Sequence, residues 1–229
     1  MIPQEWLKYA PKPRPLSAEE KWNVFLSYRS VNRTWVLNLY DVLVDLGYQV
    51  FIDQCELAAG KDLIMRLSDA LKKSQAGILI WSGEAAESDW VYKEYERLET
   101  KSTRNPNFNF VPIRLDKTEL PEFADSKIFV DFSSYPDGPN GGELLRLVHG
   151  IVGLPLSREA AHFANEQDEV FKDTAVEIEA AIRNRDPEEI LTLFEKNDLP
   201  WRTTPSLGCK AAESLTKLDR NKEALLILQ

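Results

Sequence analysis

The sequence has few of the residues that build disulfide frameworks or metal centres. It contains 2 cysteines, Cys55 and Cys209, and 2 histidines, His149 and His162, and each pair is widely separated along the 229 residues. Such distant cysteines form neither a disulfide framework nor a C-x-x-C pair, and Cys55 has no histidine nearby that would activate it as a nucleophile. We therefore expect no metal site and a reducing, cytoplasmic setting.

Membrane-spanning and secretory segments are also missing from the pattern. No stretch reaches the roughly 18 apolar residues of a membrane helix, and the N-terminal MIPQEWLKYA lacks the basic start and apolar run of a secretory signal. We therefore expect no membrane partner.

Positive charge is scarce as well. The chain has 28 basic and 37 acidic residues, which gives a net charge of −9. Because an acidic chain repels phosphate backbones, direct binding of nucleic acid is not expected. The glycine-rich DGPNGGE (137–143) lacks the G-x-x-x-x-G-K-[ST] pattern, so it predicts a turn before a helix rather than a phosphate loop.

What the chain does contain is enough apolar residues, 43%, for a buried core. Residues 1–20 include the four prolines Pro3, Pro11, Pro13 and Pro15 and are interpreted as an irregular N-terminal arm. The apolar side chains of Trp6, Leu7 and Tyr9 leave two alternatives open: the arm docks on the following domain, or it is mobile.

Short apolar runs then alternate with stretches of helical periodicity. The strand-like runs are 22–27, 48–53, 76–82, 108–115 and 127–132. The helical stretches between and after them are 31–47, 60–73, 88–101 and 141–154. This alternation predicts an α/β fold, an open five-stranded parallel sheet flanked by helices. Ligands of such sheets bind outside the carboxyl ends of the strands, so the loops after Ser27 and Asp53 are the first candidates for a site.

From about residue 155 the pattern becomes wholly helical, with helices expected at 169–185, 186–197, 206–220 and 222–229. Asp186 is the expected cap of the second helix, with Pro187 at its first position and Glu189 completing a capping box. The expected division is therefore an arm over 1–20, a domain over 21–154 and an all-α region over 155–229. The last region is loosely similar to tetratricopeptide repeats. The apolar pattern at its end suggests a fragment of a longer helical array.

Three segments together resemble the TIR domain family. VFLSYRS (24–30) resembles its first strand and loop, and LGYQVFIDQCELAAGKDL (46–63) resembles its second strand and loop. SDWVYKE (88–94) resembles the helix that carries the catalytic glutamate of NAD-cleaving TIR domains, such as the animal axon-degeneration enzyme and bacterial antiphage proteins. The resemblance covers about residues 21–154 and implies a flavodoxin-like TIR fold.

By this resemblance, Glu94 is the catalytic carboxylate of an NAD+ glycohydrolase, for which NAD+ is the substrate and no cofactor is needed. Nicotinamide leaves as a neutral base, so no general acid has to protonate it, unlike the leaving group of an ordinary glycoside. A single carboxylate suffices to stabilise the ribosyl cation. Attack by water would give ADP-ribose, and attack by an adenine nitrogen would give a cyclic isomer; the sequence leaves both open.

The resemblance also implies which residues bind NAD+. Trp90, one helical turn before the glutamate, would stack on nicotinamide or wall the pocket. Tyr28, Arg29 and Ser30 would contact ribose or phosphate, and Asp53 would hold a ribose hydroxyl. The residues themselves allow other interpretations: a core anchor for the tryptophan, a surface ion pair for the arginine and a loop cap for the aspartate.

One position departs from the family pattern, and two other functions stay open. The axon-degeneration enzyme has a pocket aromatic where this chain has Asp62, so that stacking partner is missing or comes from elsewhere. The alternatives are a non-catalytic TIR adaptor and an unrelated protein on the same fold. A receiver-like domain would need an acidic pair at the end of the first strand, where Ser27 and Tyr28 stand.

The family resemblance further implies assembly with other TIR domains. The 54–61 loop would contact a neighbouring copy and complete the site, so isolated monomers should have low activity. The helical region would receive an unknown activator. The setting implied is bacterial antiphage defence or cell-death signalling.

Overall fold

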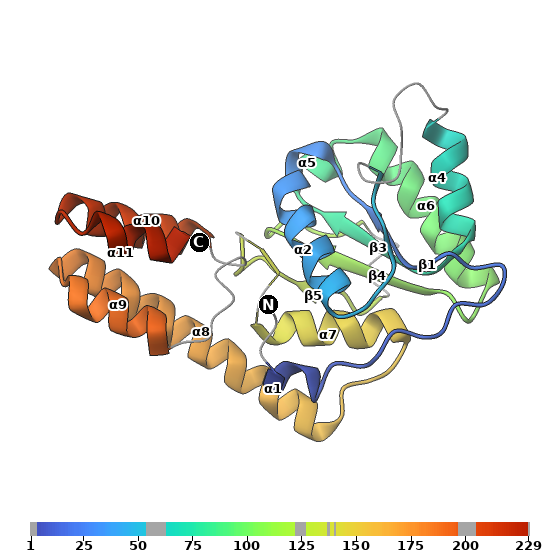
Figure 1. Ribbon diagram of the computed structural model, residues 1–229. Coiled ribbons are helices and arrows are strands. Elements are labelled where there is room, and N and C mark those ends of the chain that lie inside the picture. Colours follow the sequence, from blue (N-terminus) through green and yellow to red (C-terminus); the bar gives the residue numbers. More distant parts are fainter. Residues whose placement is uncertain are drawn as a thin grey trace.

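The computed structural model describes residues 4–53, 63–121, 127–136, 138–139, 141–196 and 205–228. Its centre is a sheet of five parallel strands in the order β2-β1-β3-β4-β5 (Figure 1). The strands are β1 (Trp22–Ser27), β2 (Val50–Phe51), β3 (Ser74–Trp81), β4 (Asn109–Arg114) and β5 (Val130–Asp131). The predicted open five-stranded parallel sheet is therefore confirmed. Since the chain leaves β1 toward β2 on one side and later returns to β3 on the other, the strand order switches at the carboxyl end of β1.

The strands differ in length because they differ in how many neighbours they have. All eight residues of the central strand β3 are buried, as its apolar run predicts. The edge strands β2 and β5 have two residues each, shorter than the predicted 48–53 and 127–132. Each edge strand pairs with one neighbour only, so fewer of its residues are held in a ladder.

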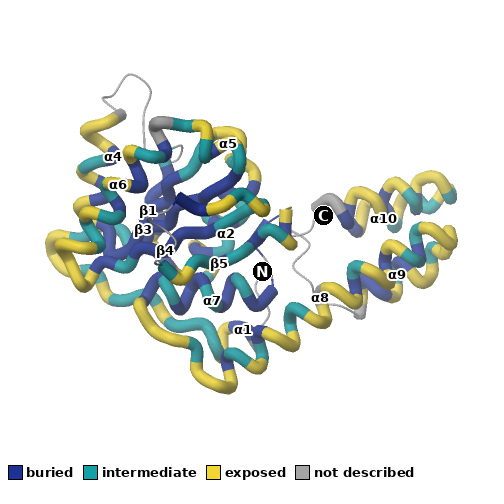
Figure 2. Tube along the Cα trace, turned by 180° about the vertical axis from the view of Figure 1, so that it is seen from behind, coloured by how far each residue is buried: buried dark blue, intermediate teal, exposed yellow. Residues whose placement is uncertain are grey.

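Two helical layers cover the sheet. On one face lie α2 (Arg33–Asp45) and α7 (Gly141–Val152), packed on the even-numbered side chains of the two central strands, such as Val24 and Ile78. On the other face lie α4 (Leu63–Lys72) and α6 (Asp89–Arg104), packed on the odd-numbered side chains, such as Phe25 and Leu79. Figure 2 shows the buried strands between these layers. The 3-10 turn η1 (Ser30–Asn32) precedes α2, and the short α5 (Gly83–Ala86) follows β3.

The N-terminal arm is docked rather than mobile. It contains one helical turn, α1 (Gln4–Leu7), in a segment predicted to be irregular. Trp6 is buried and meets the ring of Phe163 edge-on at 6.1 Å between centroids, and Tyr9 stacks on the same ring at 4.6 Å. Leu7 stays exposed. The aromatic rings thus fix a proline-rich segment that has few backbone hydrogen bonds of its own.

The helix α8 (Arg158–Asn184) joins the α/β domain to the C-terminal helices. It begins eleven residues before the predicted 169, because the Ser157 hydroxyl accepts a hydrogen bond from the Ala160 amide at 3.1 Å and caps an earlier start. The first half of α8 packs on α7, where the Asp168 carboxylate accepts hydrogen bonds from the Tyr135 hydroxyl at 2.8 Å and the Gly142 amide at 2.5 Å.

The second half of α8 forms two stacked helical hairpins with α9 (Pro187–Lys196), α10 (Pro205–Lys217) and α11 (Asn221–Leu228) (Figure 1). The Asp186 carboxylate caps α9 as predicted, accepting from the Glu189 amide at 3.1 Å. Buried positions recur 34 residues apart, in the pairs Ile178 and Ala212, Ala181 and Leu215, Ile190 and Ala224, and Leu193 and Ile227. This spacing equals the period of tetratricopeptide repeats.

Within the part of the chain that is described, none of the helices combines the length and the apolar character that crossing a bilayer requires.

Candidate functional site

Glu94 is a buried carboxylate next to the switch in strand order. Its residue is 4% exposed although it lies in the amphipathic helix α6. The Ser27 hydroxyl, at the last residue of β1, hydrogen-bonds to the Glu94 carboxylate, and the charge of Asp53, which follows β2, also acts on it. The side chain therefore faces the carboxyl ends of β1 and β2, the edge at which open parallel sheets bind ligands.

The ionisation of Glu94 is set by two opposing effects. Burial raises the pKa of Glu94, and the negative charge of Asp53 adds to that rise. The guanidinium of Arg97 donates from Nη1 to Glu94 Oε1 at 3.0 Å and lowers the pKa, as does the Ser27 hydroxyl. Burial wins, and the pKa of Glu94 stays above its ordinary value. The Arg97 side chain is 36% exposed, so water screens its charge and weakens the compensation.

A second pair of site residues lies beside this carboxylate. The Tyr28 hydroxyl donates to Asp53 Oδ1 at 2.7 Å, which links the ends of β1 and β2. Burial together with this hydrogen bond raises the pKa of Tyr28, so the phenol keeps its proton and remains a donor. The structure thus brings together Glu94, Tyr28 and Asp53, which are far apart in the sequence.

The remaining predicted residues of the loop after β1 point elsewhere. The Arg29 guanidinium donates to the backbone carbonyl of Glu84 in α5, and Ser30 is exposed at the start of η1. Asn32 donates to the Ser82 hydroxyl at 2.9 Å, next to α5. These contacts fasten the loop to the end of β3, so Arg29 and Ser30 do not join the Glu94 cluster in this structure.

Part of the predicted site lies outside the described residues. The backbone of Trp90 belongs to α6, one turn before Glu94, but its side chain is not described. The same holds for residues 54–62, which include Cys55, Asp62 and the whole 54–61 loop predicted to contact another TIR domain. The predictions for these residues therefore stay predictions.

Sequence reasoning missed two residues that touch Glu94, namely Ser27 and Arg97. A signal for Arg97 was present, because residues three apart on a helix are neighbours and a basic residue at i+3 pairs with an acidic one. Ser27 was noted only as a strand end. Within the described residues, no group of three or more His, Cys, Asp or Glu side chains lies close enough to share a metal ion.

Fold and site together define an open, parallel α/β domain with an ionisable cluster at the carboxyl edge of its sheet. A model of the TIR domain family matches residues 24–146, more than half of the chain. The chain therefore belongs to the TIR domain family.

Three relatives are similar to parts of this chain. The TMV resistance protein N of Nicotiana glutinosa is 33% identical over 92 residues, 38% of this chain and 8% of that protein. The probable 2′ cyclic ADP-D-ribose synthase TcpB of Brucella melitensis is 30% identical over 84 residues, 36% of this chain and 34% of that protein. The probable 2′ cyclic ADP-D-ribose synthase BdTIR of Brachypodium distachyon is 28% identical over 116 residues, 49% of this chain and 51% of that protein. The chain thus spans about half or less of these relatives.

Proposed function

We propose that this chain cleaves the bond between nicotinamide and ribose in NAD+, with Glu94 as the catalytic carboxylate. The observation that carries the proposal is the buried carboxylate of Glu94, paired with Arg97 and facing the ends of β1 and β2. The names of the Brucella and Brachypodium relatives, both probable 2′ cyclic ADP-D-ribose synthases, support the same class of activity.

The chemistry asks little of the protein beyond electrostatics. Breaking the glycosidic bond leaves its electron pair on nicotinamide, which departs neutral, and the positive charge develops on the ribose. An ionised carboxylate beside the ribose stabilises that charge, and the low exposure of Glu94 strengthens the interaction because little water screens it. Arg97 would help to keep Glu94 ionised, while the Tyr28 hydroxyl would hold Asp53 in place to accept a ribose hydroxyl.

Two products follow from one bond cleavage. Water that captures the ribosyl cation gives ADP-ribose, and a nucleophile within the same molecule gives a cyclic ADP-ribose. In this proposal NAD+ is the substrate and no further cofactor takes part. Trp90, Arg29 and Ser30 would contact the substrate only if the loops around them close on it.

The activity would depend on assembly. We place the contact with a second TIR domain at the 54–61 loop and the receipt of an activating signal in the C-terminal helices. The resistance protein of Nicotiana and the bacterial origin of TcpB support a role in defence or cell-death signalling.

The test compares the unchanged chain with Glu94→Gln and with Glu96→Gln, an exposed glutamate of the same helix. Each protein, concentrated and crowded, is incubated with NAD+, and nicotinamide, ADP-ribose and cyclic products are separated by chromatography. Glu94→Gln should release nicotinamide about 100- to 1,000-fold more slowly, the effect of removing one preorganised electrostatic group. Glu96→Gln should match the unchanged chain.

Two outcomes would decide against the proposal. Equal turnover by Glu94→Gln and the unchanged chain would remove the catalytic role of this carboxylate. No turnover by any of the three proteins, even in self-assembled samples, would favour the non-catalytic adaptor.

A further inference from the structure

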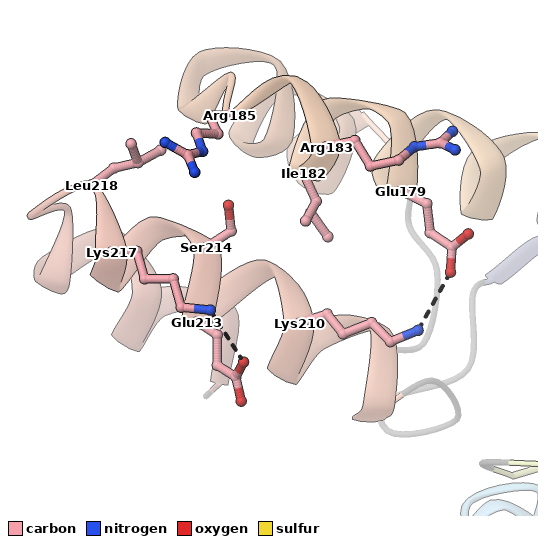
Figure 3. Close-up of a pocket in the computed structure, with 9 residues that line it drawn as sticks. All are labelled: Glu179, Ile182, Arg183, Arg185, Lys210, Glu213, Ser214, Lys217 and Leu218. Carbon is pink, nitrogen blue, oxygen red and sulfur yellow. Dashed lines mark hydrogen bonds and ion pairs between the residues drawn. The ribbon is translucent and has the colours of Figure 1, made fainter.

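A groove runs between α8 and α10, far from the candidate site. Figure 3 shows the two helices as its walls, with Ile182 and Ser214 pointing toward one another across the gap. Its volume is about 680 Å³, within the roughly 300–1,000 Å³ typical of ligand pockets. The lining residues are Glu179, Ile182, Arg183, Arg185, Lys210, Glu213, Ser214, Lys217 and Leu218.

The charge of this groove is opposite to that of the chain. Four lining side chains are basic and two are acidic, whereas the whole chain carries −9. Both carboxylates already have lysine partners, Glu179 with Lys210 at 3.4 Å and Glu213 with Lys217 at 4.0 Å (Figure 3). All four of these side chains are more than half exposed, so the pairs are weak and easily exchanged.

The two arginines are the uncommitted cations of the groove. Among the described residues, neither Arg183 nor Arg185 makes a hydrogen bond or an ion pair through its side chain. Their guanidinium groups have donors arranged to bind a carboxylate with two parallel hydrogen bonds. The groove therefore presents two free sites for carboxylates.

The backbone at Arg185 gives a reason to look for a function there. Arg185 ends α8 in the left-handed conformation, with φ 55° and ψ 42°, and its amide donates to the carbonyls of Ala181 and Ile182. Glycine performs this capping without steric cost and is the usual residue at such a position. The cap alone does not explain an arginine, whose side chain lies beside Leu218 at one end of the groove (Figure 3).

The other lining residues narrow the choice of ligand. Ile182 and Leu218 supply an apolar surface, and Ser214 supplies a hydroxyl. None of the nine lining residues is aromatic, so bases have nothing to stack on, and two carboxylates would repel a phosphate backbone. The concave surface suits an extended segment more than the convex face of a second folded copy.

We infer that the groove between α8 and α10 binds an acidic, extended peptide segment of a partner protein. Carboxylates of the peptide bind Arg183 and Arg185, and an apolar side chain between them packs on Ile182 and Leu218. This inference does not depend on NAD+ cleavage, because the groove and Glu94 lie in different parts of the molecule (Figure 1).

The test uses the whole chain without NAD+ and a fluorescein-labelled peptide, DEDLDED, followed by fluorescence polarisation. Its uncharged analogue NQNLNQN should bind at least about tenfold more weakly, because charge-assisted hydrogen bonds are lost. Arg183→Ala and Arg185→Gly should each weaken binding of DEDLDED about tenfold. Lys172→Ala, an exposed cation of α8 outside the groove, should leave binding unchanged.

Arg185→Gly separates binding from folding. Because glycine adopts the left-handed conformation more readily, this variant should melt at the same temperature as the unchanged chain or higher while it binds the peptide more weakly. Equal binding of the two peptides, or equal affinity of the arginine variants and Lys172→Ala, would overturn the inference. So would tighter binding of a single-stranded RNA, or arginine-dependent self-association without peptide binding.

Discussion

Removing the Arg97 guanidinium is the sharpest test of how Glu94 is kept ionised. Arg97→Ala leaves the carboxylate buried but takes away the cation 3.0 Å from it. Two unit charges about 4 Å apart interact by about 4 kcal/mol at the effective dielectric constant of protein surfaces. The side chain of Arg97 is 36% exposed and that of Glu94 5%, so the pair lies between an exposed one and a buried one.

The expected cost follows from that intermediate position. Exposed pairs contribute at most about 1 kcal/mol, whereas breaking a buried pair costs about 3–5 kcal/mol. We therefore expect Arg97→Ala to lower the free energy of unfolding by about 1–3 kcal/mol at neutral pH. For a chain of this size the melting temperature falls by about 2–4 °C for each kcal/mol.

The cost should depend on pH, and the direction follows from the raised pKa of Glu94. A carboxyl group whose pKa is higher in the folded than in the unfolded chain binds its proton more tightly when folded. Stability is therefore lost as the pH rises through that raised pKa, and removing Arg97 enlarges the loss. Below the ordinary pKa of glutamate, where the group is protonated in both states, Arg97→Ala should cost little.

The measurement is a double-mutant cycle of thermal melts between about pH 4 and pH 8, across the range where the glutamate titrates. In the Glu94→Gln background no charge is left to compensate, so Arg97→Ala should be nearly neutral there. Arg97→Lys should recover part of the stability, and Arg104→Ala, an exposed arginine of the same helix, serves as the control. A cost that is equal in both backgrounds, or equal at both ends of the pH range, would refute the reasoning. If Glu94 is catalytic, the acid limb of the activity profile also moves to higher pH in Arg97→Ala.

Two further predictions concern the site and the joint between the domains. Tyr28→Phe removes the hydroxyl that donates to Asp53 at 2.7 Å, worth about 1 kcal/mol, so we expect NAD+ turnover about tenfold lower with the melting temperature little changed; unchanged kcat and KM would contradict this. Gly142→Ala places a Cβ 2.4 Å from the backbone oxygen of Ala164, so calorimetry should show a loss of about 1–3 kcal/mol. Gly208→Ala, whose Cβ meets nothing nearer than 3.9 Å, should instead stabilise by about 0.5–1 kcal/mol, and equal effects of the two alanines would argue against the close approach.

Local patterns in the sequence determined the class of fold. The run 76–82 is apolar throughout, which predicts a strand covered on both faces, and β3 is buried along its whole length. The helical stretches and the order of elements were equally legible, because a period of 3.6 or 2 is a property of neighbouring residues. The motifs around Ser27, Asp53 and Glu94 identified the family for the same reason.

Boundaries and extra helical turns were less predictable. The expected start of α8 at 169 was wrong, since the polar stretch from Arg158 is held helical by its cap at Ser157 and by packing on α7. The turn α1 was likewise missed, because burial of Trp6 against another part of the chain stabilises it. Both depend on partners that the local pattern does not contain.

The tertiary structure alone decided which charged and polar groups meet. Ser27 reaches Glu94, and Tyr28 reaches Asp53, because the order β2-β1-β3 brings three separate strand ends to one edge. The groove between α8 and α10 exists because two hairpins 34 residues apart stack on each other. The sequence determined the elements through short-range periodicity, whereas the environment of each ionisable group came from long-range contacts, which depend on how those elements pack.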